Sequence, residues 1–206
     1  MLPRCIKLSC HQAAALLFII FIQLLAACSS TPIQRSLTVS APNPELKTSY
    51  QHAIQSMQAE QWQTAREQLT KITTQQPSLS GPWLNLGITQ TMLGNHMGAE
   101  TAFKTVLNIN HRAVEAYNQL GMLYRRQDRL DESQFIYEEA LRLEPDNRNI
   151  HWNLAILYDR YLPNPRQALH HYQRYQQLTG SDDPLLQAWI ARLDSQGDNM
   201  TARVKP

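Results

Sequence analysis

Histidine side chains are the groups in this chain that could bind a metal or transfer protons. The sequence holds seven of them, and His170 and His171 are adjacent. Neighbouring residues of a helix point about 100° apart, and no acidic residue stands three or four positions away to complete a metal site. We therefore expect these two imidazoles to lie on a solvated helix face, and we expect no metal site.

The carboxylates and the short motifs give no sign of catalysis either. Glu138 and Glu139 fall on an expected outer face, while Asp182 and Asp183 stand at an expected helix start, where capping explains them. The sequence contains no nucleophile elbow, phosphate-binding loop, paired-histidine metal motif or glycine-rich dinucleotide turn. We expect a protein that is not an enzyme and uses no cofactor. An envelope hydrolase is the catalytic alternative.

The composition is that of a folded chain with little net charge. The chain has 206 residues, of which 43% are hydrophobic, and a formal net charge of +2. A disordered chain has fewer apolar residues and a stronger charge imbalance, and binding to nucleic acid needs a strongly basic surface. We therefore expect one folded domain and no nucleic-acid partner.

The first segment of the chain has the features of a signal peptide. An apolar run covers 13–27, is broken only by Gln23 and follows a basic start. It is shorter than the roughly 20 residues that span a bilayer, and it ends in small residues, as cleaved signals do. All three cysteines, Cys5, Cys10 and Cys28, lie within or directly after this segment, so no disulfide or cysteine zinc site is expected in the rest of the chain.

The motif Leu25-Ala26-Ala27-Cys28 resembles the lipoprotein box of bacteria. This resemblance implies that 1–27 is removed, that Cys28 carries the acyl chains, and that Ser29 directs sorting to the outer membrane, facing the periplasm. The polar segment 28–44, rich in Ser, Thr and Pro, predicts a flexible tether. An ordinary signal peptide or an uncleaved anchor is the alternative.

A spacing of 34 residues organises the rest of the chain. Gly87 and Gly121 lie 34 apart, as do the aromatic residues Trp83 and Tyr117. Small residues in these places let two helices approach closely, and aromatic residues fill the space beyond the contact. Further sets at the same spacing are Ala65, Ala99 and Ser133; Leu69, Phe103 and Tyr137; and Pro77, His111 and Pro145.

This pattern resembles the tetratricopeptide repeat. The resemblance implies an all-α solenoid of about four helix–turn–helix units, each of which buries its apolar face on the next. The fourth unit carries one extra residue near Pro163, so its inter-helix turn should differ from the others. The expected units are about 46–79, 80–113, 114–147 and 148–181.

A further helix should cover the last unit. Asp183 can cap a helix that starts at Pro184, and the residues that follow place an apolar stripe on one face. We expect this capping helix over 182–196 and a disordered tail over 197–206.

The first helix of each unit should line a concave surface, where such scaffolds usually bind their partners. Amide side chains there could hold the backbone of an extended peptide, and arginines could receive carboxylates. The alternative is that the apolar members are half-buried packing residues and the arginines ordinary surface. The predicted partner-binding groove comprises Asn85, Ile88, Asn118, Met122, Arg125, Arg126, Trp152, Asn153 and Arg160.

The groove does not carry the pattern that binds chaperone tails. Family members that hold the C-terminal carboxylate of a chaperone use a Lys–Asn pair, then an Asn, then a Lys and an Arg. The matching positions here are Tyr50, Ile54, Asn85, Glu115 and Gln119, of which only Asn85 fits.

Together these features predict a non-catalytic, lipid-anchored scaffold that recruits or assembles an envelope complex through its groove. The partners would be envelope or periplasmic proteins, bound as a peptide or a helix, and a homodimer is also conceivable. Similarity to known lipoproteins implies two narrower alternatives. One is a pilotin-type assembly factor for a secretin or a type IV pilus, and the other is an accessory lipoprotein of an energy-transducing envelope motor.

Overall fold

The computed structural model describes the backbone of residues 44–203 and the side chains of residues 44–196. The predicted signal peptide (1–27), Cys28 and all but the last residue of the predicted tether (28–44) lie outside the described residues. Within the described part, nine α-helices follow one another and no strand occurs. They are α2 (Pro44–Gln58), α3 (Trp62–Gln75), α4 (Ser80–Met92), α5 (His96–Ile109), α6 (Val114–Arg126), α7 (Leu130–Leu143), α8 (Arg148–Arg160), α9 (Pro165–Thr179) and α10 (Pro184–Arg203).

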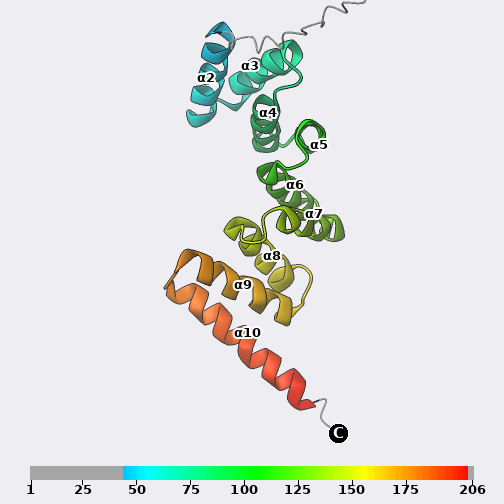
Figure 1. Ribbon diagram of the computed structural model, residues 1–206, viewed down its shortest axis with the longest axis vertical. Coiled ribbons are helices and arrows are strands. Elements are labelled where there is room, and N and C mark those ends of the chain that lie inside the picture. The colour runs from blue at the N-terminus through cyan, green and yellow to red at the C-terminus, as the bar shows by residue number, and fades with distance from the viewer. Residues whose placement is uncertain (1–43, 204–206) are drawn as a thin grey trace, which may run out of the picture. The chain divides into compact units, whose positions relative to one another are not determined.

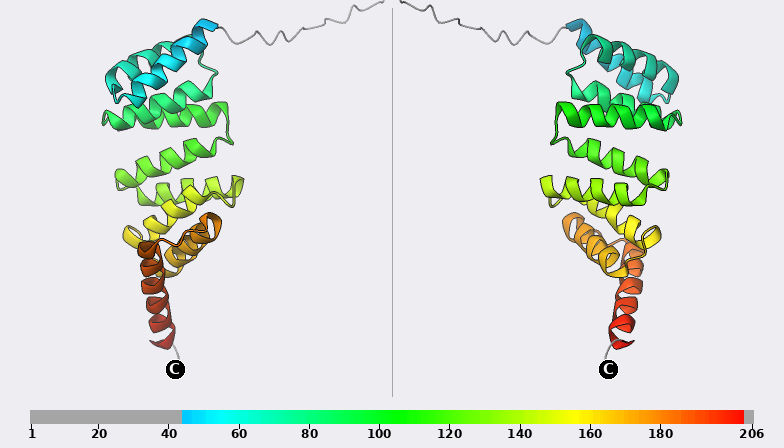
Figure 2. Two further views of the ribbon diagram at one scale, coloured as in Figure 1. Left: turned by 90° about the vertical axis from the view of Figure 1, so that its left-hand side faces the viewer. Right: turned by 90° about the vertical axis from the view of Figure 1, so that its right-hand side faces the viewer.

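The helices form antiparallel pairs that stack in chain order. Helices α2 and α3, α4 and α5, α6 and α7, and α8 and α9 pack within pairs, and the second helix of each pair also packs on the first helix of the next (Figure 1). Views from the two sides show the pairs following one another from α2 to α10 (Figure 2). The predicted all-α solenoid is confirmed. No helix of the described part has the length and apolar character needed to cross a bilayer.

Of the four turns that join the two helices of a pair, three share one backbone geometry. Glu60, Gly94 and Asp128 lie 34 residues apart and adopt the left-handed conformation, with φ of 55°, 73° and 59°. Such a residue ends a helix because the next amide can then bond back to a carbonyl of its last turn. The fourth turn differs, as expected: it has no left-handed residue, and the Leu162 amide donates to the Leu157 carbonyl at 2.8 Å.

Within each of two middle pairs, a glycine lets an aromatic ring rest directly on the neighbouring helix. A Cβ atom at Gly121 would lie 2.5 Å from the Tyr137 ring, and one at Gly87 would lie 2.4 Å from the Phe103 ring. Real Cβ atoms do not come this close, so neither position can hold a side chain without moving the ring. The buried Ser133 hydroxyl donates to the Gly121 carbonyl at 2.8 Å and ties α7 to α6.

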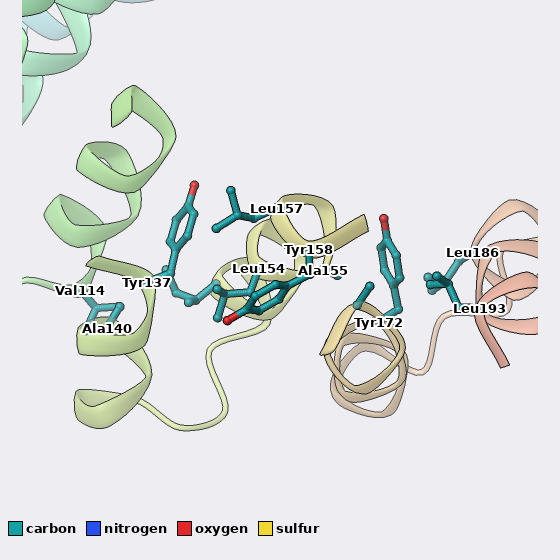
Figure 3. Close-up of a cluster of buried hydrophobic side chains, with 12 residues drawn as sticks. Val114, Tyr137, Ala140, Leu154, Ala155, Leu157, Tyr158, Tyr172, Leu186 and Leu193 are labelled. Atoms are coloured by element: carbon teal, nitrogen blue, oxygen red, sulfur yellow. The ribbon is translucent and has the colours of Figure 1, made fainter. Parts of the chain in front are cut away.

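The core runs along the stack, with its largest cluster in the last two pairs and α10. Figure 3 shows the Tyr137 ring of α7 beside Leu157 of α8, and the Tyr172 ring of α9 beside Leu186 and Leu193 of α10. The two tyrosines occupy corresponding places in their units, and both rings are fully buried. Helices α7 and α9 therefore each use one large ring to join their own pair to the helix that follows.

The C-terminal helix is longer than the sequence predicted. Helix α10 begins at Pro184 and continues to Arg203, past the expected end at 196 and into the segment 197–206 that was expected to be disordered. The segment holds no proline before Pro206, and its one glycine, Gly197, lowers helix stability by only about 1 kcal/mol. Nothing local therefore ends the helix at 196. At the other end, Pro44 of the predicted tether already belongs to α2.

His171 is a second correction, because it lies in the interior and not on a solvated face. Its side chain is 7% exposed, and its Nδ1 lies 2.9 Å from Nδ1 of His151 on α8. Nε2 of His151 is 2.9 Å from the Pro145 carbonyl, which can only accept, so His151 carries its proton on Nε2 and accepts at Nδ1 from His171. Tyr158 stacks on the His171 ring. In the described part of the chain, no group of three or more His, Cys, Asp and Glu residues is placed to hold a metal.

Burial keeps this histidine pair neutral. Burial, followed by repulsion from His151 and His170, lowers the pKa of His171 to about 3. Burial is also the largest cause that lowers the pKa of His151; the hydrogen bond to the Pro145 carbonyl opposes it, and repulsion from His170 and Arg174 adds to it. A proton added to the pair would place charge between α8 and α9 with little solvent to stabilise it.

The Gly121 contact yields a prediction about stability. Replacing Gly121→Leu should lower the free energy of unfolding by about 1–3 kcal/mol, because the Tyr137 ring must move to admit the side chain. Urea denaturation followed by circular dichroism measures this. The control Asn108→Leu, at an exposed place on α5, should change stability by less than about 0.5 kcal/mol. Equal stability of the two variants would contradict the close approach.

The histidine pair yields a prediction about pH. The pKa of His171 is lowered in the folded state, so below its ordinary value of about 6.5 the unfolded chain binds the proton and the folded chain does not. Folding stability should therefore fall between about pH 6.5 and pH 4.5, by about 2 kcal/mol from this residue.

The measurement is the unfolding free energy at both pH values in the wild type and in His171→Phe, which keeps a ring against Tyr158. The loss on acidification should be smaller in His171→Phe and unchanged in His111→Gln, a control at an exposed histidine. An unchanged loss in His171→Phe would show that the pair does not determine this dependence.

Candidate functional site

The first helices of the pairs lie side by side and line one surface. Helix α4 contacts both α2 and α6, and α6 also contacts α8. We call this surface, carried by α2, α4, α6 and α8, the concave face. All nine residues of the predicted groove lie on it. Asn85, Ile88, Met122, Arg125 and Trp152 are half-buried, Asn118 and Asn153 are buried, and Arg126 and Arg160 are exposed.

The asparagines on this face join neighbouring first helices. The Asn153 amide donates to Oδ1 of Asn118 at 2.7 Å, and the Asn85 amide donates to the Tyr50 hydroxyl at 2.6 Å. Both bonds link residues 35 apart in adjacent units. Asn118 and Asn153 are only 8% and 7% exposed, so these amides serve helix packing first. Whether their remaining polar atoms bind a partner stays a prediction.

Two apolar members of the predicted groove pack against the core. Ile88 lies against the cluster formed by α4, α5 and α6, and Met122 lies against the cluster centred on α8. Both are half-buried, which corresponds to the packing role that the sequence left open. They contribute apolar surface at the bottom of the face.

The arginines gather at the C-terminal ends of α6 and α8. The guanidinium carbon of Arg125 lies 5.7 Å from the centre of the Tyr161 ring, and that of Arg160 lies 5.9 Å from the centre of the Trp189 ring. One terminal nitrogen of Arg125 is buried without a hydrogen-bond partner. Among the described residues, neither these two arginines nor Arg126 forms an ion pair.

An aromatic cluster stands beside these arginines. The Trp152 ring lies 4.8 Å from Tyr175, 5.7 Å from Tyr172 and 6.0 Å from Trp189, measured between ring centres. Trp152, Tyr175 and Trp189 are half-buried, so the cluster keeps some accessible apolar surface. The predicted groove residues Trp152 and Arg160 are thus brought together by α10, while Asn85 and Ile88 lie two units away on α4.

This end of the face also contains residues that the groove predicted from the sequence does not include. They are Tyr161, Trp189 and Arg192. Both Asp159 oxygens accept from one Arg192 guanidinium nitrogen, at 2.8 and 2.9 Å. The apolar stripe of α10 was a usable signal for Trp189, because a helix that covers the last unit must lie against α9 and reach toward α8.

Away from the concave face, Arg129 pairs with two acidic side chains. Its guanidinium bonds Glu100 at 2.6 Å and also Glu132, and it lies over the Tyr124 ring. Hydrogen bonding by Arg129 is the largest cause that lowers the pKa of Glu100 to about 2, and Lys104 adds to it. These ion pairs join α5 to the α6–α7 pair and account for Glu100 without any catalytic role.

A family model for the tetratricopeptide repeat matches residues 114–147, which contain α6 and α7. Over 72 residues the chain is 38% identical to the human Protein O-mannosyl-transferase TMTC1. That match covers 35% of this chain and only 8% of the length of the relative, so it concerns the repeat segment alone.

Solved structures of low sequence identity share the fold. One is pilF of Pseudomonas aeruginosa, which is 18% identical with a TM-score of 0.65 and matches over 75% of this chain and 69% of that one. Another is the first tetratricopeptide domain of Spaghetti (RPAP3) bound to the HSP90 peptide SRMEEVD, which is 19% identical with a TM-score of 0.53. That match covers 55% of this chain and 90% of the other. The described part of the chain therefore has the fold of a tetratricopeptide-repeat solenoid.

Proposed function

We propose that this protein is a non-catalytic scaffold that recruits or assembles an envelope complex through its concave face. It is anchored by a lipid on Cys28 in the outer membrane and faces the periplasm. The observation that carries the proposal is the end of the concave face at α6 and α8, where Arg126 and Arg160 are exposed and Trp152 is half-buried.

The fold supports a role in binding protein segments. A tetratricopeptide solenoid offers a row of parallel first helices, and the related RPAP3 domain has been solved with a peptide bound. In this chain the corresponding face combines amides, arginines and aromatic rings, which are side chains suited to peptide backbones, carboxylates and apolar groups respectively. The partner is a protein segment that contacts the end of the face near α8.

The sequence supports the anchor. The motif that ends at Cys28 follows a short apolar run and small residues, and Ser29 stands where aspartate would favour retention in the inner membrane. Several acyl chains on one residue give stable attachment, since each buried CH₂ contributes about 0.8 kcal/mol. The partner's identity decides which envelope machine is served, whether a secretin or pilus assembly or an energy-transducing motor.

The binding role is tested by affinity capture from native envelopes with the lipidated protein. The groove variant carries Arg126→Glu and Arg160→Glu, and its matched control carries Arg112→Glu and Arg166→Glu at exposed places outside the concave face. Mass spectrometry should find a partner that the wild type and the control retain and the groove variant loses. Retention of the same partners by all three proteins would refute binding at this face.

The anchor is tested by Cys28→Ser in a bacterial host that processes lipoproteins. We expect wild-type protein in the outer-membrane fraction, labelled by a palmitate analogue. The variant should lose the label and leave that fraction, because serine has no thiol to alkylate. A variant that still carries the label would show that the lipid is attached elsewhere.

A further inference from the structure

We infer that the α6–α8 end of the concave face binds an acidic segment of a protein partner, with carboxylates on the guanidinium groups of Arg125, Arg126 and Arg160. This inference rests on the proposed scaffold function and specifies the chemistry of the partner. It differs from the chaperone-tail arrangement, whose matching positions here are occupied by Tyr50 and Ile54, among others.

Corresponding positions in two successive units differ in whether their charge is neutralised within the described chain. Arg125 of α6 and Asp159 of α8 stand 34 residues apart, at corresponding places in successive units. Asp159 is neutralised within the chain, because Arg192 of α10 donates to both of its oxygens and leaves its side chain 8% exposed. At Arg125 no carboxylate of the described residues plays the matching part. The charge of Asp159 is therefore neutralised within the described chain, whereas the charge of Arg125, at the corresponding place in the unit before it, is not.

Aromatic rings contact two of the arginines, and neither arginine forms an ion pair among the described residues. The guanidinium carbon of Arg125 lies 5.7 Å from the Tyr161 ring centre and that of Arg160 lies 5.9 Å from the Trp189 ring centre, within the range of a cation–π attraction. Such an attraction uses no N–H group as a hydrogen-bond donor, and a guanidinium can pair with a carboxylate through two parallel N–H bonds. The buried nitrogen of Arg125 that has no acceptor shows that the interior does not satisfy this group either.

On helices α4 and α6, the basic residues of the concave face lie at this end. Helix α4 carries no charged residue between Ser80 and Met92. Glu115, the acidic residue of α6, lies in the first turn of that helix, while Arg125 and Arg126 lie in its last turn. An acidic segment would therefore be placed with its carboxylates toward the ends of α6 and α8, and its apolar residues would meet the Trp152 cluster.

A protein partner fits these observations better than an extended polyanion does. The basic groups occupy one end of one face, and the whole chain has a net charge of only +2. Binding to nucleic acid or to an anionic bilayer draws on many cations spread over a wide surface. Here three arginines stand beside apolar rings, which matches a short stretch of acidic and apolar residues.

The test is a titration of the full lipid-free chain with the peptide acetyl-Leu-Glu-Glu-Leu-Asp-Glu and with its uncharged form acetyl-Leu-Gln-Gln-Leu-Asn-Gln-amide. The readout is the indole N–H signals in nitrogen-15 NMR spectra, since Trp152 and Trp189 lie beside the arginines and Trp62 and Trp83 belong to the first two units. The acidic peptide should shift the first pair of signals and leave the second pair in place. Added salt should weaken this binding.

Variants separate the site from general charge attraction. Arg126→Gln with Arg160→Gln should raise the Kd of the acidic peptide about tenfold, because each exposed charge pair that is lost weakens binding roughly threefold. The control Arg166→Gln, at an exposed place on α9, should leave the Kd unchanged. If Arg166→Gln weakened binding of the acidic peptide as much as the double variant does, the inference would be overturned.

The remaining outcomes distinguish this inference from the proposed function. If both peptides bind equally and the arginine variants change nothing, the face binds peptides but does not select acidic ones, and only this inference fails. If neither peptide shifts any signal of the concave face, this inference fails, and the affinity capture decides separately whether the proposed function holds. Signals of Trp152 and Trp189 that move with protein concentration alone, or with phosphatidylglycerol vesicles and not with peptide, would assign the surface to a second copy or to lipid and overturn the inference.

Discussion

The Tyr137 ring lies where a side chain at Gly121 would have to be, and the stacking of the described chain depends on contacts of this kind. The glycine brings α6 and α7 close enough for Ser133 to bond the backbone of the facing helix. The same ring then reaches Leu157 of the next pair (Figure 3). The Tyr137 ring therefore fixes how closely α6 and α7 approach each other, and it also forms part of the surface on which the next pair packs.

This stacking determines which side chains are left for binding. Each of α3, α5 and α7 packs on its own partner and on the first helix of the next pair, whereas the first helices also contact one another and so form a continuous row. On that surface the bonds between Asn85 and Tyr50 and between Asn118 and Asn153 hold adjacent units together. Among the described residues, the arginines at the ends of α6 and α8 form no ion pair. The groups best placed to bind a partner are therefore the arginines that have no carboxylate partner within the described chain.

Spacing in the sequence predicted the fold well because it reports which face of a helix each residue occupies. The glycines and aromatic residues at intervals of 34 identified the helix pairs and their close contacts. Spacing does not report which polar groups meet across helices. The burial of His171 depends on His151, which lies on another helix beyond the one irregular turn, and the extra residue there obscures the relation. Likewise, no pattern announced that Asn118 and Asn153 bond each other.

The irregular turn between α8 and α9 shows how this architecture absorbs a change in length. An extra residue inside a helix would rotate every later side chain by about 100° and move the apolar stripe away from its neighbours. Placed in the turn, where the Leu162 amide closes the end of α8, it rotates none of them. Ala168 and Tyr172 accordingly remain fully buried. The inter-helix turns are therefore the places where a repeat of this kind can gain or lose residues while the phase of its helices is preserved.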